Sequence, residues 1–529
     1  MSKSAQSAFF SMAVHRSSKM PGSAINNVNV DPQPLTSQDN QKLRSTLKYF
    51  SRIVRLGVPQ TASHGGTQPG IRYFRPITRG KNLARHLFLM GCIQGLLGIQ
   101  QAYAATYYVS PSGSDNNNGT AQSSPVKTIG KALDKAWSSG DIVYVMTGTY
   151  AETVEIDQSG ITLSAYQDDK PVIDGGNSLL GRDWGNLISV DGNNNTVSGF
   201  EVKNSNINGA HLGGYGIQLW GHHNTVSKMN VHHTWSNAVI VNGDYNIVED
   251  SIVWQASFGN SANPGSSGWG SGLSAARNDS SSALKPGITS YAILRRNTVF
   301  NNWGEGLSCY EADHCTLEDN TVYDNWGTNI YLSDVTNSVV QRNLVYVSSN
   351  RAIPSPGQVG ITLADEVSSV PRSANNTIIN NFIYNTDLDA FSWSGVANAG
   401  LNNVLIANNT IIDGNLFTGR AGGIVNTNSQ IRNNIITGKN SSVPSNSGIT
   451  FSHNNWGATP SLAAASTNIV GDPQVARTGS TAPGAVTSAY FKIAGSSPVI
   501  DAATSLNSVT NDFFKSARET APDIGGHEF

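Results

Sequence analysis

The chain repeats itself with a period of about 23 residues, and this repetition constrains the fold more than any other feature of the sequence. The segments Tyr291–Trp303, Cys315–Trp326 and Ser338–Tyr346 align with one another, with an Asn at the same place in each and apolar residues in register around it. The recurring residues are Asn297, Asn320, Asn343, Asn381, Asn409 and Asn434. Short β-branched segments between Asn or Gly corners at this period are typical of one turn of a parallel β-helix. The Leu scaffold of leucine-rich repeats, which have a similar period, is absent.

We expect each recurring Asn to take left-handed backbone geometry at a tight corner, and its amide to bond to the Asn or the backbone one coil away. This column resembles the Asn ladder of the pectate-lyase-like right-handed parallel β-helix superfamily, over roughly residues 106–460. The resemblance implies an all-β fold, a right-handed single-stranded parallel β-helix of about ten coils, with a helical N-terminal cap and a C-terminal cap segment. It implies less about the reaction, because β-helices host many chemistries.

The chain is expected to divide into five segments. Residues 1–78 are hydrophilic and predict a disordered presequence or a miscalled start, and residues 79–104 predict a signal peptide cleaved near Ala104. The apolar run inside 79–104 is short for a membrane span, so we expect a secreted or periplasmic mature protein without a transmembrane segment; a buried helix is the alternative. Residues 105–185 are assigned to the N-terminal cap and first coils, 186–460 to the β-helix core and 461–529 to the C-terminal cap.

Charge and cysteine content narrow the function. Only 13% of residues are charged, and the acidic residues outnumber the basic ones after residue 85, which disfavours nucleic acid as a partner. Three cysteines make no disulfide framework and no zinc-site spacing, although Cys309 and Cys315 can form a local disulfide across one corner. We expect a monomer.

If the Asn column marks the corner between the second and third strands of each coil, the first strand follows the next corner. This places the first strands in Trp269–Arg277, Trp303–Glu311, Trp326–Asp334 and Gly360–Asp365, where the resemblance to pectate lyases implies the floor of a substrate cleft. Four insertions flank these strands and predict loops around a cleft over residues 217–393; they are 256–268, 277–290, 346–357 and 366–374.

A Trp column precedes the first strands. Trp235, Trp269, Trp303 and Trp326 each stand four residues before an apolar strand position. Their rings can bind sugars by face stacking, or they can form an internal stack that plugs the corner. Trp220, Trp269, Trp303, Trp326 and Tyr331 are the predicted substrate-binding residues.

An acidic column follows the first strands. Arg277, Glu311, Asp334 and Asp365 would lie on consecutive coils about 5 Å apart, so the carboxylates need protonation, Arg277 or a cation to neutralise them. Three outcomes are open: a Ca²⁺ site of Glu311, Asp334 and Asp365, a carboxylate pair of the glycosidase type, or a solvated edge without a role.

The remaining candidates are single residues. Glu305 lies between two glycines, which lets a ligand approach closely, and Tyr310 faces the same outer surface as Tyr331. Lys228 and Lys285 are the basic candidates. The histidines look scattered over different corners and are not expected to act.

The resemblance and the predicted secretion together favour an enzyme that degrades a polysaccharide. The first hypothesis is a lyase that cleaves a uronate polymer of the pectate or alginate type by β-elimination, with Tyr310 or Lys228 as base and Arg277, Lys285 or calcium as the positive group. However, the Asp cluster and Lys/Arg base motif of calcium-dependent pectate lyases are not recognisable here, nor is the Asn-Gly-rich Arg motif of alginate and chondroitin lyases. One alternative is a glycoside hydrolase that uses two carboxylates as acid and as base or nucleophile, chosen from Glu305, Glu311, Asp334 and Asp365. The other is a non-catalytic glycan-binding β-helix.

Overall fold

The computed structural model describes residues 104–529 except 183–184, 207–212, 266–268, 278–286, 354–358, 367–371, 387–388, 396–398 and 420–423. The predicted presequence, the predicted signal peptide up to residue 103 and Lys285 therefore lie outside the described residues. In the described part of the chain, no helix has the length and apolarity needed to cross a membrane.

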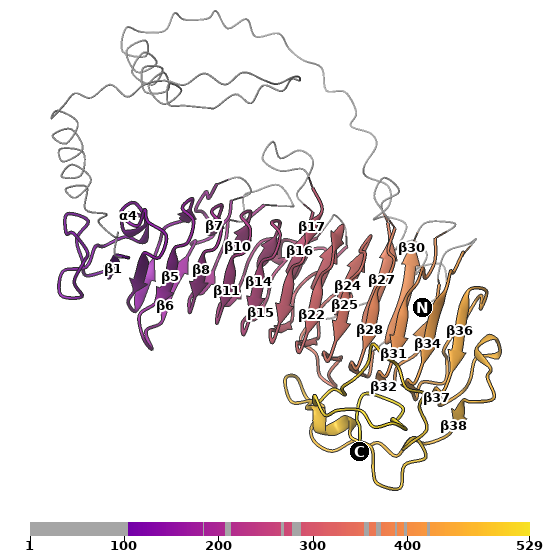
Figure 1. Cartoon of the computed structure of the whole chain (residues 1–529). Coiled ribbons are helices and arrows are strands. Elements are labelled where there is room, and N and C mark those ends of the chain that lie inside the picture. Colours follow the sequence, from indigo (N-terminus) through magenta and orange to yellow (C-terminus); the bar gives the residue numbers. More distant parts are fainter. Residues whose placement is uncertain are drawn as a thin grey trace, which may run out of the picture. The chain divides into compact units, whose positions relative to one another are not determined.

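Three long sheets, all of whose strand pairs are parallel, run side by side along the chain (Figure 1). In the described residues sheet A has 13 strands: β1 (Thr106–Val109), β2 (Ile142–Val145), β5 (Thr162–Ala165), β8 (Thr196–Ser198), β11 (Thr225–Ser227), β14 (Ile247–Glu249), β18 (Ile293–Arg295), β22 (Thr316–Glu318), β25 (Val339–Gln341), β28 (Thr377–Ile379), β31 (Leu405–Ala407), β34 (Ser429–Arg432) and β36 (Ile449–Ser452). Sheet B, counted over the same residues, also has 13: β3 (Gly148–Tyr150), β6 (Pro171–Asp174), β9 (Glu201–Lys203), β12 (Asn230–His232), β15 (Ile252–Trp254), β19 (Thr298–Phe300), β23 (Thr321–Tyr323), β26 (Leu344–Tyr346), β29 (Phe382–Tyr384), β32 (Thr410–Ile412), β35 (Ile435–Ile436), β37 (Asn455–Trp456) and β38 (Ile469–Val470).

Sheet C supplies the first strand of each coil. Its 10 strands within the described ranges are β4 (Val154–Ile156), β7 (Ile188–Val190), β10 (Ile217–Leu219), β13 (Val239–Val241), β16 (Ser271–Ala276), β20 (Glu305–Tyr310), β24 (Ile330–Ser333), β27 (Ile361–Asp365), β30 (Phe391–Gly395) and β33 (Leu416–Phe417). Each coil passes through sheets C, A and B in that order, which is the predicted right-handed parallel β-helix. A short pair, β17 (Thr289–Ser290) with β21 (Ala312–Asp313), lies at the corner between sheets C and A.

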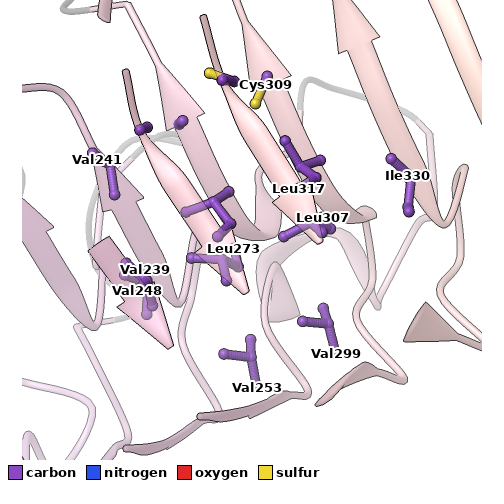
Figure 2. Packing of buried hydrophobic residues seen from close by; sticks show 14 of the residues in the cluster. Val239, Val241, Val248, Val253, Leu273, Val299, Leu307, Cys309, Leu317 and Ile330 are labelled. Atoms are coloured by element: carbon purple, nitrogen blue, oxygen red, sulfur yellow. The ribbon is translucent and has the colours of Figure 1, made fainter. Parts of the chain in front are cut away.

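The core forms because each strand turns one apolar residue in three, or alternate residues in a longer strand, toward a shared interior. Figure 2 shows such residues from all three sheets, among them Leu273, Leu307 and Ile330 of sheet C, which pair in register and are fully buried. The register aligns the first strands as the repeat predicted.

The Asn column forms a continuous ladder at the corner between sheets A and B. Asn320 Oδ1 accepts from the backbone N–H of Asn297 at 2.9 Å, and Asn320 Nδ2 donates to Leu294 O at 2.9 Å and to Asn343 Oδ1 at 2.9 Å. The predicted bonding is confirmed, but the predicted backbone geometry is wrong. The left-handed residue is the one before each Asn, such as Asp319 (φ 57°), which faces outward and frees the Asn side chain to point into the corner.

Two segments cover different parts of the β-helix, one at its N-terminal end and one along sheet B. Helix α4 (Ile129–Leu133) packs on β1, β2 and β4 and is capped by the Thr128 hydroxyl, which accepts from Lys131 N. The segment after β38 contains the 3₁₀ helix η3 (Ser488–Phe491), and the apolar side chains of this segment bury the outer face of sheet B from β23 to β35. Two further short 3₁₀ helices are η1 (Phe258–Asn260) and η2 (Ser461–Ala463). The C-terminal segment is therefore a cover on one side of the coils.

Cys309 and Cys315 are both free and buried, and their thiols contact each other across the corner between sheets C and A. The disulfide that their spacing allows is not formed in this structure. Burial raises the pKa of the Cys309 thiol, and the hydrogen bond to Cys315 raises it further, so the thiol stays protonated.

We predict that Asn320→Ala destabilises the protein by about 3 kcal/mol, because it leaves the buried Asn297 N–H without its acceptor and removes a donor from the Leu294 carbonyl. Urea titration gives the free energy of unfolding. The exposed Asn116 provides the matched control, since Asn116→Ala should change stability by less than about 0.5 kcal/mol. Equal effects of the two substitutions would contradict the role of the ladder.

Candidate functional site

A kink in β20 turns Glu305 to the outer face of sheet C. Strict alternation from the buried Leu307 would place Glu305 inside. However, a Cβ on Gly306 would lie 2.8 Å from Val322 Cγ1, so Gly306 also faces the interior. Two consecutive inward residues, the first of them glycine, bring Glu305 to the outside, where it is half-buried.

Glu305 is held in an environment that favours its neutral form. Trp269 Nε1 donates to Glu305 Oε1 at 2.7 Å, and Ser271 lies on the other carboxyl oxygen. Burial raises the pKa of Glu305 to about 7, and the negative charge of Glu366 contributes in the same direction against the hydrogen bond from Trp269. A carboxyl with this pKa can give or take a proton near neutrality.

Glu366 joins Glu305 through Tyr331. The Tyr331 hydroxyl donates to Glu366, and the negative charge of Glu305 is one of the causes that raise the pKa of Tyr331. Burial raises the pKa of Glu366, while the bond from Tyr331 opposes that shift. The sequence prediction missed Glu366 because it was counted as the start of an insertion; its place directly after Asp365 at a strand end is the signal that could have found it.

Tyr310, Glu311 and Arg277 form a second group at the other end of β20. Arg277 Nη1 lies 2.6 Å from Glu311 Oε2, and the Tyr310 hydroxyl also donates to Glu311. Burial and the Glu311 charge raise the pKa of Tyr310 well above its usual value. Tyr310 therefore keeps its proton, which disfavours the predicted role as a base, and the Arg277 charge is already paired.

The carboxylates of the acidic column have partners within the protein. Arg277 compensates Glu311, and Asp334 accepts from Ser333 Oγ at 2.9 Å and from Glu366 N at 3.0 Å. Burial raises the pKa of Asp365 to about 6, and the nearby Asp334 charge raises it further. Within the described residues, no group of three or more His, Cys, Asp or Glu side chains is placed to hold a metal ion. Glu311, Asp334 and Asp365 therefore do not fit the expected calcium site.

The Trp column does not form an open row of ring faces. Trp326 of this column is 3% exposed, and Trp220, which was predicted to bind substrate but lies outside the column, is 4% exposed, so neither can present a ring to a sugar. Trp269 packs edge to face on Trp326, with ring centroids 4.9 Å apart, and Trp303 instead bonds to Gln255. The alternative that the column plugs a corner fits Trp326 better.

The other predicted residues lie elsewhere. Lys228 is exposed in the turn between β11 and β12, at the corner between sheets A and B, so the structure does not bring it to Glu305. The histidines are less scattered than predicted, because His223 and His314 share the corner between sheets C and A.

Two family models match the β-helix. The Pel9A-like right-handed β-helix region matches residues 107–279, within the sheets described above. The fold is the right-handed parallel β-helix expected from the resemblance to the pectate-lyase-like superfamily, and residues 107–279 are similar to this family model. A second model, that of the periplasmic copper-binding protein NosD, matches residues 194–413.

Individual relatives match short parts of this β-helix. The uncharacterized protein YwoF of Bacillus subtilis is 32% identical over 120 residues, 22% of this chain and 25% of YwoF. Pectate lyase PEL9 of Emericella nidulans is 39% identical over 79 residues, 14% of this chain and 19% of that enzyme. The chain thus matches a quarter or less of each curated relative's length.

The solved structure of pectate lyase Pel9A superposes with a TM-score of 0.47 at 16% identity, covering 81% of this chain and 97% of that chain. Neither a substrate nor a reaction follows from a likeness of this size.

We predict that stability falls between pH 5 and pH 8 and that Glu305→Gln reduces this fall by up to about 3 kcal/mol. The folded state holds the Glu305 proton up to pH 7, whereas the unfolded state releases it near the ordinary value of 4.5, so the folded state loses its advantage over this interval. Gln can still accept from Trp269. Urea titrations at pH 5 and pH 8 measure the free energy of unfolding. Glu519→Gln changes an exposed carboxylate and serves as the control; an equal loss of stability with pH in the two variants would contradict the role of Glu305.

Proposed function

We propose that the protein is a secreted or periplasmic carbohydrate-active enzyme that hydrolyses glycosidic bonds of a polysaccharide, with Glu305 as the general acid. The observation that carries the proposal is the Glu305 carboxyl itself, turned outward by the kink in β20, bonded to Trp269 and raised in pKa to about 7. A carboxylic acid that remains protonated near neutral pH can donate its proton to the oxygen of a leaving sugar.

Glu366 is the proposed second carboxylate. Hydrolysis needs one protonated and one ionised carboxyl group. Burial raises the pKa of both groups, to about 7 at Glu305, and at Glu366 the hydrogen bond from the Tyr331 hydroxyl opposes the rise and favours the charged form.

In the proposed reaction the proton of Glu305 passes to the glycosidic oxygen as the bond from that oxygen to the anomeric carbon breaks. Ionised Glu366 either removes a proton from the attacking water or attacks the anomeric carbon itself. Tyr331 orients Glu366 through its hydroxyl and is a positioning residue.

Polysaccharide as substrate and export as location rest on the comparisons. The Pel9A-like β-helix model and the match to pectate lyase PEL9 support a carbohydrate polymer. The periplasmic NosD model supports an exported protein, in agreement with the signal peptide expected in residues 79–104.

β-Elimination on a uronate polymer is the second candidate, and the match to PEL9 favours it. In that reaction ionised Glu305 would serve as the base. The charges of the site disfavour elimination, because Glu305 lies near Glu366, which in turn lies near Asp334. The positive charge of Arg277 is already paired with Glu311. Like charges would repel a uronate chain.

We predict that Glu305→Gln lowers turnover by about 100-fold or more, because Gln keeps the bond to Trp269 but cannot exchange a proton. New reducing ends released from xylan, polygalacturonate and alginate measure turnover. Glu519→Gln, which changes an exposed carboxylate, should retain wild-type activity. Full activity of the Glu305 variant would refute its catalytic role.

The pH profile separates the two reactions. A general acid must be protonated, so hydrolysis should decline as pH rises through about 7, whereas elimination with Glu305 as base should increase over the same interval. Ultraviolet absorbance of an unsaturated uronate accompanies elimination alone. Reducing ends without this absorbance, together with the declining profile, are the expected result.

A further inference from the structure

Four exposed aromatic rings stand in one stack at the corner between sheets C and A. His223 stacks on Tyr245 with ring centroids 4.7 Å apart, Tyr245 on Tyr291 at 4.7 Å, and Tyr291 on His314 at 4.6 Å. Tyr245 is 46% exposed and Tyr291 40% exposed. We refer to His223, Tyr245, Tyr291 and His314 as the corner stack.

The backbone at these positions is one that aromatic residues rarely adopt. All four have positive φ, from 53° to 59°, and each donates its N–H to a carbonyl of the next coil, as Tyr245 does to Ser290 O at 2.9 Å. Left-handed geometry suits Asn far better than a bulky ring.

The neighbouring coils show what the corner ordinarily holds. The same column continues as Asn337, Asn375, Asn403 and Asn428, all with positive φ, and their side-chain amides bond to one another from coil to coil at 2.8–3.0 Å. In four consecutive coils, exposed aromatic rings replace these mutually hydrogen-bonded Asn side chains. Exposed aromatic surface at an unfavourable backbone position points to a contact with something outside the chain.

The position of the corner stack limits the choice of partner. His314 follows Glu311 by three residues, and β17 and β21, which precede Tyr291 and His314, are anchored to each other at the edge of sheet C. The ring faces inside the stack cover one another, so each Tyr presents its edge and hydroxyl to solvent. The result is a row of polar groups and ring edges, spaced by one coil, parallel to the line of sheet C strands.

We propose that the corner stack is a secondary glycan-binding site that holds a polysaccharide chain along the edge of sheet C, at the end of β20 opposite to Glu305. A linear polysaccharide offers repeated hydroxyls and apolar C–H groups along its length, and both match tyrosine edges and hydroxyls. This inference rests on the proposed function for its ligand class, but it concerns binding and not cleavage.

The test compares the wild type with the double variant Tyr245→Asn/Tyr291→Asn, which extends the natural Asn row and so preserves the corner geometry. Native gels that contain polygalacturonate, alginate or xylan report binding as retardation. We expect the double variant to lose at least severalfold of the retardation in the gel that retards the wild type. Tyr245→Phe/Tyr291→Phe keeps the rings and should lose less.

Two further measurements separate this inference from the proposed function. Glu305→Gln should be retarded like the wild type although it is inactive, and the double Asn variant should cleave a short oligosaccharide at the wild-type rate. Unchanged retardation of the double Asn variant overturns the inference, as does a wild type that migrates freely in every gel. A change in sedimentation coefficient without loss of retardation also overturns it, because the stack would then be a contact between copies of the chain.

Discussion

Coil-to-coil hydrogen bonding through the buried Asn ladder is the interaction on which the rest of the structure depends. A coil of three short strands cannot satisfy the backbone groups at its corners by itself, and a buried unpaired N–H is costly. Asn297, Asn320 and Asn343 each supply an acceptor to one neighbour and a donor to the other, so every corner is complete only when the next coil is in place. The stacking also sets the spacing of everything displayed on the outside of the sheets.

That spacing explains the electrostatics of the outer face of sheet C. Side chains in one column lie a single coil apart, so carboxylates gather more closely than they would on a flexible surface. The chain relieves this crowding in two ways, by the Arg277–Glu311 ion pair and by burial that favours the protonated forms of Asp365 and Glu305. The pKa of Glu305 is raised mainly by burial, and the neighbouring Glu366 charge adds to the rise.

The fold could be predicted from the sequence because the same pattern of apolar and Asn positions recurs in many coils. The register of Leu273, Leu307 and Ile330 and the bonds of the Asn ladder followed from periodicity alone. The site was harder, because it depends on departures from the period. The outward turn of Glu305 needs the inward Gly306, and Glu366 belongs to the site only because its side chain meets Tyr331. Trp326 occupies the predicted position in the repeat but is buried. The alignment could not predict this burial, because it does not show on which side of a corner a ring lies.

The C-terminal segment that covers sheet B changes how the array can come apart. In a simple solenoid each repeat touches only its neighbours, and coils can fray from either end. Here Lys515 pairs with Asp319, 196 residues earlier in the chain, while Thr504 O accepts from Asn433 and Arg518 bonds to Asn380. One strap therefore holds coils that are far apart in the series, and local opening between residues 319 and 433 requires the strap to detach first. This portion should behave as a single cooperative unit in hydrogen exchange, whereas the uncovered N-terminal coils keep the independence of a repeat protein.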